Sequence, residues 1–212
     1  MGSVSTPARR TQRERVEESS RRLAEAAIEL IAEKGYSNTT AREIGVRAGY
    51  SRAMVGERFG TKEALLDSVL EQHYERRIDV DPDPGASGLE RVLAPVDALC
   101  TFAAEDPRLL RAMFVLNFEA IHDPDVLRQR IRSWLSRLRD RLTEAALAGQ
   151  SDGTVTADVD ATEISGEIMA AGIGYAYMWI VAPEEIDLES ILRRWRDRLA
   201  NTLRPGRPTS SR

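Results

Sequence analysis

Four side chains that suit binding to nucleic acid occur within one short segment of the sequence, residues 42–58. They are Arg42, Ser51, Arg52 and Arg58. A guanidinium group pairs bidentately with phosphate or with the edge of guanine, and a serine hydroxyl bonds to either partner. These side chains could therefore recognise nucleic acid, provided that the secondary-structure elements carrying them present them on one surface.

Two short predicted helices joined by a glycine turn carry them. A Thr-x-x-Glu capping box at Thr40 starts the first helix, which ends near Ala48, and Ser51 is expected to cap the second, which runs to about Phe59. Gly49 supplies the conformational freedom of a sharp turn. The pair has the spacing of a helix-turn-helix, in which the second helix enters the major groove of DNA.

Longer predicted helices flank this pair. One begins at Thr11, in a capping box with Glu14, and ends at Gly35; the other begins after Thr61 and runs to about Ile78. The apolar side chains of the pair, Ile44, Ala48 and Val55, are expected to face inward and to hold the two short helices together.

Four motifs occur in order between residues 21 and 66: Gly35-Tyr36, Thr39 to Ile44, Ala48 to Arg52, and Phe59 to Leu65. Together they resemble the N-terminal DNA-binding domain of the tetracycline-repressor (TetR) family of bacterial transcriptional regulators. The resemblance implies that Thr40, Ser51, Arg52 and Lys62 contact operator DNA, with Lys62 on phosphate. It also implies a helical C-terminal domain that binds a ligand and dimerises.

The segment departs from the family pattern at a few positions. Gly56 stands where a phosphate-contacting tyrosine is common, Tyr50 replaces a small aliphatic residue and Gly45 replaces alanine. Arg58 stands where histidine or an aromatic residue is frequent, and we expect it to supply the phosphate contact that Gly56 cannot make. A glycine inside a helix costs about 1 kcal/mol relative to alanine, so we expect a less stable domain.

The charge of the chain is divided unevenly. Residues 1–62 hold 12 basic and 8 acidic side chains, a net charge of +4, whereas residues 63–212 hold 18 basic and 26 acidic side chains, a net charge of −8. The overall charge of −4 therefore conceals a basic end suited to a polyanion and an acidic remainder with another role.

The whole sequence predicts an all-α fold of about nine helices, with a three-helix helix-turn-helix domain followed by a helical bundle. Later helices are expected from about Leu89 to Ala104 with Pro95 inside, after Asp106-Pro107 and after Asp123-Pro124 as far as Gly149, from Asp160 to about Val181, and from Leu188 to Leu203. We expect a disordered arm at 1–10, a DNA-binding domain at 11–60, a ligand-binding and dimerisation domain at 61–203 and a disordered tail at 204–212.

The last two predicted helices are the candidates for a homodimer interface. The helix from Asp160 carries the small residues Ala170, Ala171, Gly172, Gly174 and Ala176, which allow close approach of another helix, and the final helix carries an unbroken apolar stripe. The alternative is that both stripes belong to the core of one chain.

Large apolar side chains elsewhere in the bundle suit a small-molecule pocket. The candidates are Phe102, Phe114, Phe118, Trp134, Met169 and Tyr175. Few polar residues interrupt the stripes, which predicts a largely apolar effector.

Other chemistry lacks a candidate site in the sequence. The single cysteine, Cys100, cannot complete a disulfide or thiolate metal site, and no phosphate loop, nucleophile elbow or metal-ligand cluster occurs, so we expect no metal, no cofactor and no enzymatic activity. The run Ile168 to Ala182, about 15 residues, is shorter than the about 20 that span a bilayer, and residues 1–22 lack the apolar core of a signal peptide. These features predict a cytoplasmic protein without a membrane partner.

The sequence thus predicts a transcriptional regulator, a repressor that a small effector releases from a pseudo-palindromic DNA operator. Two alternatives stay open: an activator of the same family, and an all-α protein-interaction module.

Overall fold

The protein is helical throughout the part that the computed structural model describes, residues 11–75, 83, 85–122 and 126–206. The α-helices are α1 (Gln12–Lys34), α2 (Ala41–Arg47), α3 (Met54–Phe59), α4 (Lys62–Val69), α6 (Gly88–Glu105), α7 (Pro107–Glu119), α8 (Val126–Asp152), α9 (Ala161–Val181) and α10 (Leu188–Leu203). A π-helical segment, η1 (Leu70–Glu75), continues α4. The predicted all-α class and helix number are confirmed for these residues; the expected arm at 1–10 and residues 207–212 of the expected tail lie outside them.

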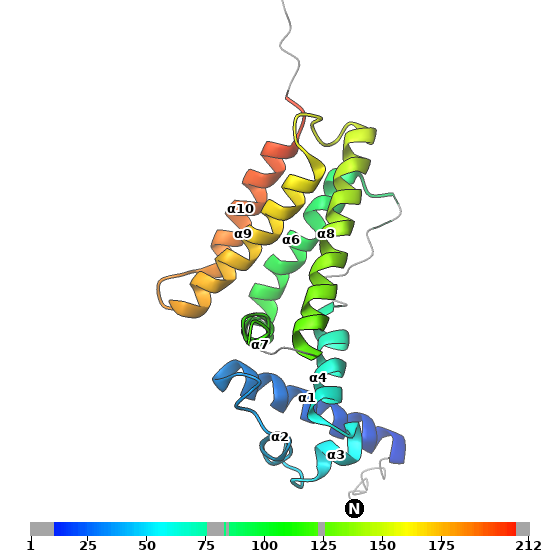
Figure 1. Cartoon of the computed structure of the whole chain (residues 1–212), viewed down its shortest axis with the longest axis vertical. Helices are drawn as coiled ribbons and strands as arrows, with labels where there is room; N and C mark the ends of the chain where they lie inside the picture. Colours follow the sequence, from blue (N-terminus) through cyan, green and yellow to red (C-terminus); the bar gives the residue numbers. More distant parts are fainter. Residues whose placement is uncertain (1–10, 76–82, 84, 123–125, 207–212) are drawn as a thin grey trace, which may run out of the picture.

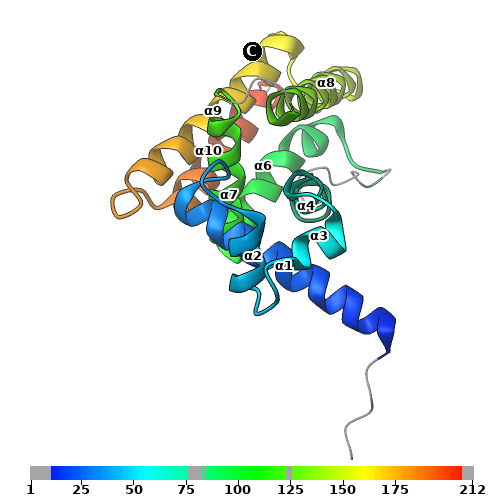
Figure 2. The same ribbon diagram turned by 60° about the horizontal axis from the view of Figure 1, so that its bottom comes forward.

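The helices form two groups along the long axis of the molecule. Figure 1 shows α1 to α4 at one end and α6, α8, α9 and α10 side by side above them, with α7 seen end-on between the groups. Figures 1 and 2 both place α7 directly against α1, the longest helix of the first group, and the two helices pack together.

Capping explains where most helices begin. The predicted capping boxes Thr11–Glu14 and Thr40–Glu43 are both formed, and Asp106 and Asp160 cap α7 and α9 where the sequence predicted these helices to begin. A further box, Ser87 with Glu90, starts α6, which the sequence pattern predicted to begin only at Leu89. Pro95 therefore lies inside α6 and does not delay its start.

The expectation that Ser51 caps the second short helix was wrong. α3 begins three residues later, at Met54, and its N-cap Ala53 makes no side-chain capping bond. The amide of Met54 donates instead to the carbonyl of Ser51, at 3.1 Å, so residues 51–54 form a turn before the helix starts.

The predicted end of the long helix at Gly149 was also wrong. α8 continues to Asp152, and Gly153, with φ 76°, follows it. Gly149 allows the start of α6 to pack closely against α8. A Cβ on Gly88 would lie only 2.0 Å from the amide nitrogen of Gly149. The predicted extension of α4 to Ile78 ends outside the described residues.

One hydrophobic core runs through both groups of helices. Its fully enclosed side chains include Leu23 and Ile31 of α1, Ile44 and Val55 of the two short helices, and Leu110 and Met113 of α7. The expected inward positions of Ile44 and Val55 are thus confirmed, and Ala48 packs partly buried against the same core.

α9 is an exception to this burial. By length and composition alone, α9 is the one helix of the described part that could cross a membrane, although the apolar run in the sequence was too short to predict this. Only 22% of its most apolar 18-residue window is buried inside the protein. Tyr177, Met178 and Val181 are among its exposed apolar side chains.

We predict that Gly88→Ala destabilises the protein by about 1–3 kcal/mol, because the new methyl group must push α6 away from the backbone of α8. Gly56→Ala, in α3, is the control: a Cβ there meets no atom within 4 Å, and the change should raise stability by up to about 1 kcal/mol. Chemical denaturation of the two variants measures both effects, and equal midpoints would contradict the close approach.

Candidate functional site

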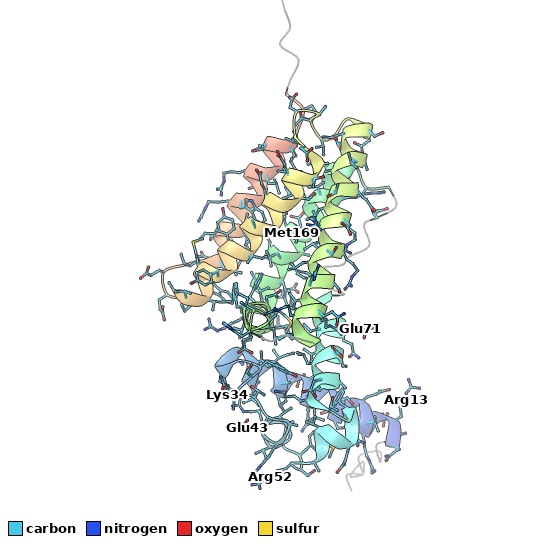
Figure 3. The ribbon with its side chains drawn as sticks, in the orientation of Figure 1. Arg13, Lys34, Glu43, Arg52, Glu71 and Met169 are labelled. Carbon is cyan, nitrogen blue, oxygen red and sulfur yellow. The ribbon has the colours of Figure 1, made fainter. Side chains whose placement is uncertain are left out.

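The tip of the helix-turn-helix presents two cationic side chains to solvent. Arg42, on α2, and Arg52, in the turn before α3, are exposed, as is Ser51. Neither guanidinium has a hydrogen-bond or ion-pair partner within the described residues. Figure 3 shows Arg52 at the extremity of the molecule, pointing away from the helical bundle.

Many other cations of this region are neutralised by neighbouring carboxylates. Arg47 pairs with Glu33 at 2.8 Å and with Glu29 at 3.3 Å. Both hydrogen bonds raise the pKa of Arg47, and the bond to Glu33 has the larger effect. On α1, Arg21 and Arg22 share Glu18. The net positive charge counted along the sequence therefore overstates the free charge of the folded domain, whose unpaired cations include Arg42 and Arg52.

Thr40 is held by Glu43 at the start of α2. Its hydroxyl donates to Glu43 Oε2 at 2.8 Å and accepts from the Glu43 amide at 3.2 Å, while Glu43 Oε1 accepts from Lys34 Nζ at 2.7 Å. The Lys34 and Thr40 hydrogen bonds lower the pKa of Glu43 to about 2. Figure 3 shows Lys34 and Glu43 beside each other. The threonine is exposed but already bonded within the chain.

Arg58 and Lys62 lie further inside than the sequence suggested. Arg58 is half-buried, and its Nε donates to the Ser19 hydroxyl of α1 at 2.7 Å. Lys62 Nζ donates to the carbonyls of Tyr36 and Thr39, at 3.1 and 2.9 Å, and lies 3.8 Å from the centroid of the Tyr36 ring. Burial lowers the pKa of Lys62. Two of its three N–H donors are thus engaged in bracing the α1–α2 connection.

Gly45 has a packing reason that the sequence did not reveal. A Cβ at this position would lie 2.4 Å from the carbonyl oxygen of Ser51, and the amide of Tyr50 donates to the Gly45 carbonyl at 2.9 Å. The turn therefore lies directly on α2. At Gly56 a Cβ would meet no atom within 4 Å, so no such constraint applies there.

The two groups of helices are joined by a carboxylate that sequence reasoning missed. Glu119, at the end of α7, accepts hydrogen bonds from the amides of Tyr36 and Ser37, at 2.8 and 3.1 Å. Gly35, with φ 83°, precedes these amides, and a Cβ there would lie 1.8 Å from Glu119 Oε1. Only the three-dimensional contact identifies this pair, because 83 residues separate Glu119 from Tyr36.

Two arginines add further connections between the groups. Arg130 of α8 pairs with Asp67 of α4 at 2.6 Å, and Arg111 of α7 donates to the carbonyl of Ala32 in α1 at 3.4 Å. Arg111 also donates to the carbonyl of Ile180, at the end of α9, at 3.3 Å. These contacts connect α7 and α8 to α1 and α4.

An apolar cavity of about 60 Å³ lies within the bundle, between α6, α7, α8, α9 and α10. Three of the predicted pocket residues line it: Phe114, Trp134 and Met169. The sequence did not single out Leu99, Ile168 or Trp195, which also line it, because as members of apolar stripes they are indistinguishable from ordinary core residues.

The other three predicted pocket residues do not line this cavity. Phe102 is buried in the core face of α6, Phe118 packs edge-on against Tyr177 of α9, and Tyr175 packs against Trp195. The Tyr175 hydroxyl also accepts a hydrogen bond from Arg198 of α10, at 3.3 Å. The structure therefore brings together half of the predicted set.

Within the described ranges, no group of three or more His, Cys, Asp or Glu side chains is placed so that it could hold a metal ion. Cys100 is half-buried, and burial raises the pKa of its thiol, so the reactive thiolate is disfavoured.

Comparison with known proteins gives two family matches. The model of bacterial regulatory proteins of the tetR family matches residues 23–69, and the model of tetracyclin repressor-like C-terminal domains matches residues 88–182. The first match covers the C-terminal half of α1 and all of α2, α3 and α4, and the second extends from α6 to the start of the α9–α10 connection.

Individual proteins agree with the family matches. HTH-type transcriptional regulator TtgR of Pseudomonas putida is 26% identical over 207 residues, which cover 92% of this chain and 96% of that protein. For the uncharacterized HTH-type transcriptional regulator YvkB of Bacillus subtilis, identity is 37% over 57 residues, and the match spans 27% of this chain and only 30% of the relative. The solved structure of a SmeT–triclosan complex is similar in fold, with a TM-score of 0.71 at 21% identity, covering 89% of this chain and 93% of that one.

The two glycines of the short helices should respond oppositely to alanine. We expect Gly45→Ala to destabilise the domain by about 1–3 kcal/mol, because the methyl group displaces the Ser51 carbonyl and the turn. Gly56→Ala should stabilise α3 by up to about 1 kcal/mol. Thermal unfolding followed by circular dichroism distinguishes them, and a stabilising Gly45→Ala would rule out the close contact.

Proposed function

The chain belongs to the TetR family of bacterial regulatory proteins, and from this premise we propose that it is a repressor that binds a pseudo-palindromic operator as a homodimer and leaves it when a small effector binds. The chain is a helix-turn-helix transcriptional regulator, and ligand-responsive repression by homodimers is typical of the family. Members of the family are regulators and not enzymes.

The free cations at the tip of the helix-turn-helix are the observation that carries the DNA-binding assignment. Arg52 and Arg42 are exposed and have no partner in the described part of the chain, so they are available for bidentate pairing with guanine. Ser51, exposed beside Arg52, supplies a hydroxyl for a base or a phosphate. We assign these three side chains to operator recognition.

Three further residues are proposed to position the domain on the phosphate backbone. Thr40 is exposed at the start of α2, Lys62 retains one N–H donor, and Arg58 lies in the last turn of α3. Because Lys62 and Arg58 also brace the fold, their contribution to binding is expected to be smaller than that of a fully free cation.

The homodimer is proposed to form through α9 and α10. The exposed apolar side chains Tyr177, Met178 and Val181 of α9 would be covered there, and Gly166 and Gly174 have open space where a partner helix can approach. Two helices from each subunit then form a four-helix interface. A two-fold dimer presents its recognition helices to half-sites about 34 Å apart, one turn of DNA.

The effector is proposed to bind at the cavity lined by Phe114, Trp134 and Met169, with Phe102, Phe118 and Tyr175 packed in the surrounding bundle. An almost purely apolar lining favours a largely apolar ligand, as does the triclosan bound by the similar protein SmeT. A volume of about 60 Å³ is far below the about 300–1,000 Å³ of ligand sites, so binding must displace the surrounding helices.

That displacement gives a route to the DNA-binding domain. Phe114 and Asn117 line the cavity from α7, and Glu119 on the same helix holds the Tyr36 and Ser37 amides. The Arg130–Asp67 pair connects α8 to α4 in parallel. A shift of these helices changes the separation of the two recognition helices, and a coupling of about 1–3 kcal/mol suffices for release.

The proposed division of the chain places DNA binding at 11–60 and ligand binding with dimerisation at 61–203, with residues 1–10 and 204–212 as an arm and a tail. We propose that the protein acts in the cytoplasm, where its operator DNA lies.

We predict that Arg52→Ala weakens operator binding by about tenfold to a hundredfold, the equivalent of the about 1–3 kcal/mol of a bidentate base contact. The operator is first selected from random duplex DNA with the unmodified protein, and affinities are then measured by fluorescence anisotropy at several salt concentrations. Arg137→Ala, an exposed arginine of α8, is the control and should leave affinity unchanged.

Two results would contradict the proposal. Failure of the unmodified protein to enrich any sequence would reject operator binding, and an unchanged affinity of Arg52→Ala would reject the assignment of this arginine. Dimer formation should be the same in both variants, because neither site lies on α9 or α10.

We predict that Glu119→Gln loosens the connection between the two groups of helices. The neutral amide loses charge-assisted bonds to two backbone N–H groups, each worth about 1.5–3 kcal/mol. Hydrogen exchange at Tyr36 and Ser37 should therefore accelerate about tenfold or more, whereas Glu105→Gln, on the exposed end of α6, should not change it. Unchanged exchange in Glu119→Gln would show that the negative charge of this side chain does not strengthen its bonds to the two amides.

A further inference from the structure

A second cavity, open to solvent and about 770 Å³ in volume, adjoins the apolar one between α7, α8 and α9. Asn117, Leu135 and Met169 line both, so the two spaces are neighbours across a shared wall. Figure 3 shows Met169 between the ribbons of α9 and α8. The outer cavity has the volume of a ligand site, which the inner one lacks.

The outer cavity differs from the inner one in charge. Its lining, as far as the described residues form it, contains three arginines of α8, Arg128, Arg132 and Arg139, and no acidic residue. The same face of α8 contributes the apolar side chains Ile131 and Leu135. The outer cavity is therefore both cationic and apolar.

The three arginines differ in their engagement. Arg128 donates to the backbone carbonyls of Ala120 and Ile121 and closes the end of α7. Arg132 and Arg139 are exposed, and neither guanidinium has a hydrogen-bond or ion-pair partner within the described residues. Spacings of three and four residues put both on the side of α8 that carries Leu135, where an anion can reach them together.

We propose that the effector is an amphipathic organic anion. Its single anionic group, a carboxylate or a phosphate monoester, pairs with Arg132 and Arg139, and its apolar body lies on Leu135 and Met169 and enters the inner cavity. This inference rests on the proposed function and adds a charge requirement to it: a wholly uncharged ligand leaves both guanidinium groups without a partner.

The test compares ligands that share one apolar chain and differ only in head group. Decanoate, decyl phosphate, decanol and decylamine are titrated, below their micelle concentrations, into the full-length protein without DNA. Binding is followed by calorimetry and by tryptophan fluorescence, to which Trp134 and Trp195 of the cavity wall contribute. We expect at least one of the two anions to bind about tenfold or more tightly than decanol, and decylamine to bind most weakly. Equal affinities, or tighter binding of decanol or decylamine, would overturn the proposal.

Variants of the two free arginines locate the head group. Arg132→Gln combined with Arg139→Gln should weaken binding of the preferred anion about tenfold or more and leave decanol binding unchanged. Arg137→Gln, on the same helix but outside the cavity lining, is the control and should bind the anion normally. An unaffected anion affinity in the double variant would also overturn the proposal, since the arginines would then form only a solvated face of α8.

Operator binding is measured separately on the same samples. If the protein selects a DNA sequence but no anion is preferred, the effector class is wrong and the regulatory function stands. If no DNA sequence is selected while the anion binds through the two arginines, the site is correct and the proposed function fails.

Discussion

The structure depends on one short segment, Gly35 to Ser37, in which both halves of the molecule meet. Glu119 of α7 accepts from two amides of this segment, Lys62 of α4 donates to the Tyr36 carbonyl, and the Tyr36 hydroxyl donates to Glu63 at 3.3 Å. Gly35 permits the arrangement because any Cβ would occupy the place of the carboxylate. The helix-turn-helix is thereby fixed both to α4 and to α7, which contributes Phe114 to the cavity wall.

Fewer cationic side chains are available for binding in the folded protein than the sequence suggests. The N-terminal third of the chain is basic in net charge, but four of its cations are paired with carboxylates of α1 or α2: Arg21, Arg22, Lys34 and Arg47. The pairs of Lys34 and Arg47 hold α2 against α1, whereas Arg42 and Arg52 at the tip have no partner in the described part of the chain. The arginines of α8 differ in the same way. Arg130 is paired with Asp67 of α4, while Arg132 and Arg139 are not paired within the described residues. The position of the unpaired guanidinium groups, rather than net charge, marks both candidate binding surfaces.

Much of the fold was predictable because its signals are local. Capping boxes at Thr11 and Thr40 fix helix starts through hydrogen bonds that span three residues, and apolar side chains at helical spacing, such as Ile44 and Val55, identify the buried faces. Where local signals compete, prediction failed. Ser51 has the right residue type for a cap, yet the contact of its carbonyl with Gly45 draws it into the turn, and Gly149 continues α8 because Gly88 packs on it.

The sequence by itself determined the helical class, the order of the helices, the family motifs between Gly35 and Leu65 and the residue types available for binding. Tertiary structure decided which of those residues remain free. It turned Lys62 and Arg58 inward, separated Phe102, Phe118 and Tyr175 from the cavity that Phe114, Trp134 and Met169 line, and brought Glu119 to Tyr36. The physical reason is range: capping and periodicity act within a few residues, whereas pairing, cavity walls and close backbone approach join residues that are tens of positions apart and exist only after the helices pack.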